Sequence, residues 1–341
     1  MDKLGGLRHA AIHPLALKEI DPYIYPAVSQ EDYLPTETER EYVARQKRLK
    51  QIRDDFAAGK IAAINDFITY NLDIEAFVQD FLEGLTDSQT LRAFYFEGLK
   101  KLTVLDPTVG SGAFLFAAMN ILETLYEICL DKMEELADAK YPDFRDELAS
   151  IANHPNRAYF VFKTIIVNNL YGVDILEEAT EICKLRLFLK LVAQVERDDH
   201  KPNLGIEPLP DIDFNIRAGN TLVGYASLEE IEEAGKRSLF ALDLPQQIRG
   251  ADTAIRAYRT LQTQMGISAR ELAQAKKQTA KKLGEIETAL NQSLSADYGA
   301  RSVDKFAKTH EPFHWYVEFN QIMQDGGFDV IVGNPPYVVT G

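Results

Sequence analysis

The sequence predicts an α/β protein with a doubly wound, mainly parallel sheet. Two observations support this fold class: four short apolar stretches have the composition of strands, and helical stretches separate them. Strands that alternate with helices are joined by right-handed crossovers and therefore pair in parallel. Ligands of such sheets bind at the carboxyl ends of the strands, so these ends are where a site is expected.

The four strands are expected at residues 102–106, 169–175, 214–220 and 328–332. The helix predicted after the second strand has apolar residues at the spacing of an amphipathic helix, namely Ile182, Leu185, Leu189 and Val192. The last strand, "FDVIV", is apolar and β-branched, with two glycines ahead of it and two prolines behind it. This composition is typical of a short buried strand.

The sheet pattern divides the chain into three parts. Residues 1–100 are predicted to form a mostly helical N-terminal region, in which Thr36 and Glu39 fit a capping box ahead of a charged helix. Residues 101–225 and 326–341 form the core with the four strands, and residues 226–325 form a helical hairpin insertion between the third and fourth strands. The basic run of the charged helix is flanked by acidic residues, which favours a solvated face over a nucleic-acid site.

Composition limits the classes of function. The net charge of −15 over 341 residues argues against broad contact with phosphates, so a protein that acts on nucleic acid would need most of its grip elsewhere. The sequence contains neither an apolar stretch of membrane length nor a signal peptide, and we expect a cytoplasmic protein. Cys129 and Cys183 are expected to be reduced core thiols. We expect no metal site, because Pro312 disfavours the helix that would bring His310 and His314 to one face.

The stretch "DPTVGSGAF", residues 106–114, lies at the end of the first strand and the start of a helix. Gly110 and Gly112 would let the backbone approach a ligand closely, and the helix N-terminus favours a negative group such as a carboxylate. No Gly-Lys-Ser/Thr sequence follows, which excludes a P-loop. The alternative is a glycine turn that serves packing alone.

Asp174 ends the second strand, where a carboxylate can accept hydrogen bonds from both hydroxyls of a ribose. It lies further from the glycine turn than in dinucleotide-binding folds, and we attribute the excess to extra helix at about residues 134–163. The alternative role for Asp174 is to cap the helix that follows.

The stretch "GNPPY" follows the fourth strand. Asn334 offers a side-chain carbonyl oxygen and Pro335 a backbone carbonyl, which together suit a planar NH2 group with two donors. Tyr337 offers a ring on which a flat substrate can stack. Hydrogen bonds from both hydrogens of such a group favour the tetrahedral nitrogen that can attack an electrophilic methyl group. A rigid turn is the alternative.

These stretches, with "GVDI" and "AGNTL" between them, resemble the gamma-class N6-adenine DNA methyltransferases that use S-adenosylmethionine. "PFHWYVEF" ahead of the last strand is similar to the large restriction-modification (type IIG-like) and phage-exclusion enzymes of bacteria. The resemblance implies a Rossmann-like core that is incomplete in this chain, and double-stranded DNA as the partner, bound through regions outside it. The implied functional residues fall into four groups: Asp106, Thr108, Gly110 and Gly112 at the methionine end of the cofactor; Asp174 and Ile175 at its ribose and adenine; Asn220 and Thr221 beside the adenine; and Asn334, Pro335 and Tyr337 as the methyl-transfer site for a flipped base.

Some features depart from this family. Asn220 stands where an acidic residue is common, and a cofactor motif expected ahead of the first strand is not recognisable. We expect the chain to be a central fragment without a target-recognition domain, inactive alone, and the sequence gives no support for a linked nuclease. Asn-Pro-Pro-Tyr also serves enzymes that methylate protein glutamine or guanine of ribosomal RNA. These enzymes, and an inactive cofactor-binding fragment, are the alternatives.

Overall fold

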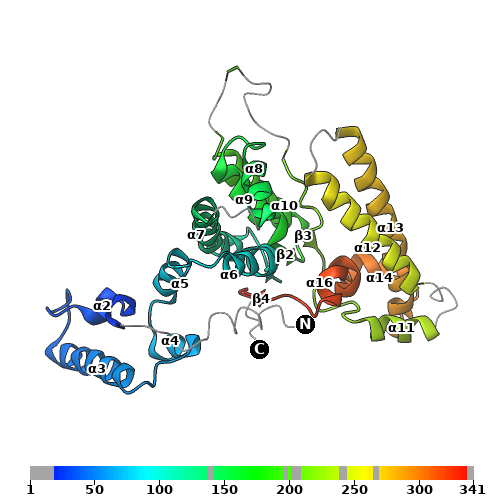
Figure 1. Ribbon diagram of the computed structural model, residues 1–341. Helices are drawn as coiled ribbons and strands as arrows, with labels where there is room; N and C mark the ends of the chain where they lie inside the picture. The colour runs from blue at the N-terminus through cyan, green and yellow to red at the C-terminus, as the bar shows by residue number, and fades with distance from the viewer. Residues whose placement is uncertain are drawn as a thin grey trace. The chain divides into compact units, whose positions relative to one another are not determined.

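The computed structural model describes residues 19–136, 141–195, 199–200, 209–237, 244–263 and 269–335 (Figure 1). The chain forms two compact units, Met1–Lys101 with Thr124–Ser150, and Leu102–Glu123 with Ile151–Gly341. The second unit contains the sheet and the ends of its strands, so it is the unit that positions the candidate site.

The first unit is helical in its described residues. Its elements are η1 (Asp21–Tyr23), α2 (Pro26–Ser29), α3 (Glu39–Ala57), α4 (Ile64–Tyr70), α5 (Ile74–Glu83), α6 (Ser88–Arg92), the π-helical η2 (Ala93–Gly98), η3 (Leu99–Lys101), the second half of α7 (Ala113–Glu135) and nearly all of α8 (Pro142–Ile151). Basic residues of α3 pair with acidic ones, as in Arg45 with Glu37 at 2.7 Å and Arg53 with Asp21 at 2.8 Å. These pairs agree with a charged face that is internally neutralised rather than open to phosphates.

The capping box predicted at Thr36 and Glu39 is wrong by two residues. The N-cap of α3 is Thr38, whose hydroxyl accepts from Glu41 N while the Glu41 carboxylate accepts from Thr38 N at 2.9 Å. Thr36 has a φ of 68°, in the left-handed region, so it lies outside the extended conformation that an N-cap requires. The same Thr-x-x-Glu spacing occurs at both places, and the pattern alone could not choose between them.

The sheet has four parallel strands in the order β3-β2-β1-β4. Their bounds are β1 (Val104–Asp106), β2 (Leu170–Asp174), β3 (Ile216–Ala218) and β4 (Val330–Ile331). All four fall inside the stretches that the sequence predicted, which confirms the α/β fold class. Strand β4 pairs with β1, with Val104 opposite Val330.

The expectation that the fourth strand is buried is wrong for the described part of the chain. Val330 and Ile331 point to opposite faces of the sheet, and both are exposed, at 42% and 65%. Val330 N donates to Thr103 O and Val332 N to Leu105 O, so β4 is paired on its β1 side. The described residues provide no strand on its other side, and this edge position explains the exposure of an apolar sequence.

Helices α9 (Arg157–Asn168) and α10 (Glu177–Val192) pack against β2 and β3, and α7 (Ala113–Glu135) follows β1. The residues of α10 that are buried are Thr180, Cys183, Leu187 and Leu191. Ile182, Leu185 and Leu189, which form the apolar stripe seen in the sequence, are at least half exposed. The helix is therefore apolar on two faces, and the periodicity alone could not tell which one meets the sheet.

One described helix, α7, is long and apolar enough to cross a membrane, although the sequence suggested no such stretch. Length and composition alone are weak evidence, because core helices share them. The helix starts at the glycine turn after β1 and buries Leu115, Met119 and Tyr126 completely. These contacts identify α7 as a core helix of the fold.

Aromatic residues cover the face of the sheet near β1 and β2. Phe313, Trp315 and Phe319 come from "PFHWYVEF", which includes α15 (Trp315–Glu318), and Phe328 lies just ahead of β4. The short helix α16 (Asn320–Gln324) adds the apolar residues Ile322 and Met323. Phe319 meets Tyr171 of β2 edge to face, with ring centroids 5.7 Å apart, and Phe328 meets the same ring at 5.5 Å. The aromatic motif ahead of the last strand therefore builds one side of the sheet's core.

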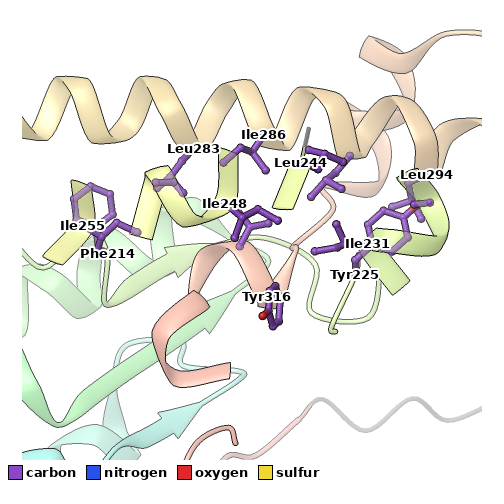
Figure 2. Packing of buried hydrophobic residues seen from close by; sticks show 14 of the residues in the cluster. Phe214, Tyr225, Ile231, Leu244, Ile248, Ile255, Leu283, Ile286, Leu294 and Tyr316 are labelled. Atoms are coloured by element: carbon purple, nitrogen blue, oxygen red, sulfur yellow. The ribbon is translucent and has the colours of Figure 1, made fainter. Parts of the chain in front are cut away.

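In the sequence, a helical insertion separates β3 from these aromatic residues. Its helices are α11 (Leu228–Arg237), α12 (Leu244–Thr263), α13 (Ala269–Asp297) and α14 (Val303–His310). Helices α12 and α13 run side by side (Figure 1). Figure 2 shows Ile248, Leu283 and Ile286 meeting in the space between them. Phe214, predicted to start the third strand, belongs to this cluster instead, which explains why β3 begins later, at Ile216.

Candidate functional site

The glycine turn joins β1 to α7 and is fastened to β2. Gly110 and Gly112 have φ angles of 49° and 86°, in the left-handed region that glycine adopts without strain. A Cβ on Gly112 would lie 2.7 Å from Cys183 Sγ of α10, whereas the space around Gly110 is open. Val109 N donates to Val173 O at 2.9 Å. The turn is thus packed tightly on one side and left with room on the other.

The Asp106 carboxylate lies under this turn. The side chain is 1% exposed, and its Oδ1 accepts from Thr108 N at 3.0 Å. Its Oδ2 is buried and accepts no hydrogen bond from any residue that the structure describes. Burial raises the pKa of Asp106 above its ordinary value, and the negative charge of Asp174 adds to this, while the bonds from Thr108 oppose it. A buried acceptor without a donor indicates a place where a ligand or water completes the bonding.

The end of β4 lies against the same turn. A Cβ on Gly333 would meet Asp106 Oδ1 at 3.0 Å, Thr108 Oγ1 at 3.1 Å and Pro107 Cδ at 3.2 Å. Asn334 and Pro335 follow directly and are exposed, while Tyr337 lies outside the described residues. The proposed methyl-transfer residues that can be located therefore leave the sheet at the edge where the Asp106 turn lies.

Asp174 connects the glycine turn to the loop after β3. Its Oδ2 accepts from Gly110 N at 2.8 Å, and its backbone oxygen accepts from Gly219 N at 2.8 Å. Its Oδ1 accepts from Leu176 N at 3.0 Å, but Leu176 is the N-cap residue of α10. Asp174 therefore orders the entry to α10 without being its N-cap. Each carboxylate oxygen keeps a further lone pair for a ligand.

The "AGNTL" loop after β3 is enclosed by residues of "PFHW". A Cβ on Gly219 would lie 2.8 Å from Phe313 Cδ2, and one on Gly224 only 2.1 Å from Phe313 O. Trp315 Nε1 donates to Thr221 O at 3.1 Å. Asn220 N donates to Glu311 O at 2.7 Å, and Asn220 pairs with Pro312 in a parallel bridge. The shape of this loop depends on residues 311–315, which follow α14 near the end of the insertion.

A cavity of about 700 Å³ opens beside the ends of β2 and β3. Ile175, expected beside the adenine, is one of its lining residues and is half exposed. The lining also includes Gly219 and, from the end of the insertion, Thr309, Glu311 and Pro312. Of the residues that the resemblance assigns to the adenine end of the cofactor, Ile175 is the one that the described lining includes, and Asn220 and Thr221 lie next to its lining residue Gly219 in the sequence.

His314 is a structural residue of the loop's enclosure. Its Nδ1 accepts from Tyr225 N at 3.2 Å, its Nε2 pairs with Asn291 Oδ1 at 3.1 Å, and its ring stacks on Tyr225. Burial lowers its pKa to about 4, so it is neutral at pH 7. Both ring nitrogens are engaged by protein groups, so His314 is not available to ligate a metal ion.

Sequence reasoning assigned no role to Gly333, Phe313 or Glu311. Gly333 could have been suspected, because a glycine between a strand and Asn-Pro-Pro can mark a close approach of two backbones. The aromatic motif resembles a family feature, but nothing in its spacing indicates that Phe313 packs on Gly219 and Gly224. Glu311 has no local signal, since its position depends on the fold of the insertion.

Comparison with known proteins gives the family. Residues 168–341, half of the chain, match the Eco57I restriction-modification methylases. The chain belongs to this family. Residues 82–238 also match the DNA-methyltransferase domain of MmeI, a match that begins ahead of β1.

A relative from Methanocaldococcus jannaschii, named as a type II restriction enzyme and methyltransferase, is 31% identical over 299 residues. The match covers 72% of this chain but 23% of the relative, so the chain spans about a quarter of the length of that protein. No solved structure matches the chain significantly.

The residues present fit the cofactor that an Eco57I-type methylase implies. S-adenosylmethionine carries positive charge at its sulfonium and ammonium groups, and Asp106 Oδ2 is a buried carboxylate acceptor that has no donor among the described residues. The open space around Gly110 could accommodate the carboxylate of the cofactor. The remaining lone pairs of the Asp174 carboxylate could accept hydrogen bonds from its ribose.

Proposed function

We propose that this chain carries the S-adenosylmethionine-dependent methyl-transfer site of a restriction-modification enzyme that modifies N6 of adenine in DNA. The observation that carries the proposal is the contact of Gly333 with Asp106 and Thr108, at 3.0 and 3.1 Å from a Cβ position. This contact puts the start of "NPPY" next to the buried carboxylate, so methyl donor and acceptor groups would meet there.

Different residues of the chain would bind the cofactor and the adenine base. Asp106 would stabilise the positive end of the cofactor, Asp174 would accept from its ribose, and Ile175 would contact its adenine. When bound, S-adenosylmethionine supplies an electrophilic methyl group. Asn334 Oδ1 and Pro335 O would accept both hydrogens of the adenine amino group and so favour the tetrahedral nitrogen that attacks. These bonds strengthen in the transition state, and no ionised base is needed before transfer.

The family match favours DNA over the other planar nitrogens that Asn-Pro-Pro-Tyr can serve. A base paired in a duplex cannot reach a site at a sheet edge, so the adenine must be flipped out. The exposed Asn334 and Pro335 are compatible with the approach of a large substrate. The chain's net charge of −15 means that the groups that hold the DNA backbone would come from other parts of the enzyme.

Two measurements test the proposal. Calorimetry on the 341-residue chain should detect binding of S-adenosylhomocysteine, and the whole protein that contains this chain should form N6-methyladenine in duplex DNA. In that protein Asn334→Ala should lower the rate of methyl transfer by about 100- to 1000-fold, while the affinity for S-adenosylhomocysteine changes less than about twofold. Methylation of a release factor or of ribosomal RNA in place of DNA would overturn the assignment of substrate.

A further inference from the structure

Asn220, which the resemblance sets beside the adenine of the cofactor, is engaged within its own loop. Its Oδ1 accepts from Leu222 N at 3.1 Å, and its backbone N–H donates to Glu311 O at 2.7 Å. Asn220 also stands where related enzymes commonly have an acidic residue. An uncharged amide that already accepts one bond is a weak receptor for the adenine amino group.

Glu311 brings a carboxylate to this place from the end of the insertion. It is the C-cap residue of α14, and the bridge between Asn220 and Pro312 fixes its backbone beside the loop after β3. Its φ of 45° is in the left-handed region, which is uncommon for glutamate and which it adopts here as the C-cap. Glu311 also lines the 700 Å³ cavity that adjoins Ile175.

The Glu311 carboxylate is available to a ligand. The residue is exposed, and no described residue forms an ion pair or a hydrogen bond with its side chain. Two other carboxylates line the cavity, those of Glu177 and Glu178, but both belong to the first turn of α10. Glu311 is the one whose backbone is paired to Asn220, at the border assigned to the adenine.

We propose that Glu311 is a specificity-determining residue for the cofactor, and that its carboxylate accepts a hydrogen bond from the adenine amino group in the role that Asn220 does not fill. A carboxylate accepts but cannot donate, so it favours a 6-amino purine and disfavours a 6-keto purine. The insertion thereby takes part in cofactor recognition. This inference rests on the proposed use of S-adenosylmethionine.

The test compares S-adenosylhomocysteine with S-inosylhomocysteine, in which a keto oxygen replaces the adenine amino group. Calorimetry on the 341-residue chain should give tighter binding of S-adenosylhomocysteine by about tenfold or more. Glu311→Gln should reduce this preference to about threefold or less, because an amide can donate to the keto oxygen. Glu311→Asn is a second variant, since asparagine tolerates the left-handed backbone. Glu178→Gln is the matched control and should keep the preference of the unchanged chain.

The outcomes separate the two proposals. Failure of the unchanged chain to bind S-adenosylhomocysteine would overturn the proposed function together with the role of Glu311. If the chain binds S-adenosylhomocysteine but both Glu311 variants keep its preference, the role of Glu311 is wrong and the function stands. Loss of the preference in Glu178→Gln alone would assign the amino group to the first turn of α10 and would also refute the role of Glu311.

Discussion

The β3 and β4 edges of the sheet are built in different ways. After β3, the "AGNTL" loop is enclosed by Phe313 and Trp315, and the insertion packs beyond it. At β4, Val330 and Ile331 are exposed, and so are Asn334 and Pro335. The first arrangement suits a small ligand held by fixed walls, and the second suits a large substrate that arrives from outside. Glycine serves close approach at both edges, at Gly219 and Gly224 on one and at Gly333 on the other.

The enclosure after β3 should be the more sensitive edge. Gly224→Ala should lower the free energy of unfolding by more than about 3 kcal/mol, because the new Cβ would lie 2.1 Å from Phe313 O and the φ is 144°. Gly299→Ala is the control, since its φ of 64° is also left-handed but the space is open, and it should cost about 1 to 2 kcal/mol. Thermal and denaturant unfolding measure both, and equal losses would show that the loop is not rigidly enclosed.

Asp174 links the glycine turn to the loop after β3, so its loss should affect cofactor binding. Asp174→Ala should weaken S-adenosylhomocysteine binding by about 10- to 150-fold, or about 1.5 to 3 kcal/mol, since a charge-assisted bond to ribose and the bond from Gly110 N are lost. Asp174→Asn retains one acceptor oxygen and should give an intermediate affinity in calorimetry. Unchanged affinity in both variants would contradict the ribose role.

Acid should destabilise the enclosed edge through His314. Its pKa is about 4 in the folded chain against 6.5 as the ordinary value, so the unfolded chain binds more protons between these pH values. The free energy of unfolding should therefore fall by about 1.5 kcal/mol as the pH drops from 6.5 to 5. Burial raises the pKa of Glu318, although the neighbouring Arg217 guanidinium lowers it, so protonation of Glu318 as the pH drops opposes this fall.

Comparison with His314→Gln isolates the histidine from Glu318 and other groups. The variant should lose the His314 part of the pH dependence, so its curve of unfolding free energy against pH should be flatter or reversed between pH 5 and 6.5. Parallel curves for the two proteins would show that His314 is not buried as a neutral ring.

At the β4 edge, a smaller stabilising interaction joins the start of β4 to the residue ahead of β1. Asp329 Oδ2 accepts from Thr103 N and Thr103 Oγ1, both at 2.9 Å, and Asp329 N donates to Thr103 Oγ1 at 3.0 Å. A double-mutant cycle with Thr103→Val and Asp329→Ala should give a coupling of about 1 kcal/mol in unfolding. Additive losses would indicate that the β1–β4 register does not depend on this pair.

The sequence was most informative where local chemistry is self-contained. The positions of the four strands and their parallel direction follow from apolar runs that alternate with helices, and the glycine turn follows from the positions of its glycines. It was less informative where position depends on distant packing. Thr38 and Thr36 have the same capping pattern, the stripe at Ile182 and Leu185 is apolar yet exposed, and Glu311 is brought to the cavity only by the folded insertion.

The bridge between Asn220 and Pro312 has a consequence for how this protein can be varied. Phe313 N donates to Val223 O, and Tyr316 N to Tyr225 O, so the chain leaves the sheet and returns to it through adjacent backbone positions. Because the ends are already held together, each doubling of the intervening length adds only about 0.6 kcal/mol of closure entropy. One helical insertion can therefore be exchanged for another between these paired positions, in evolution or by engineering, while the strands keep their register.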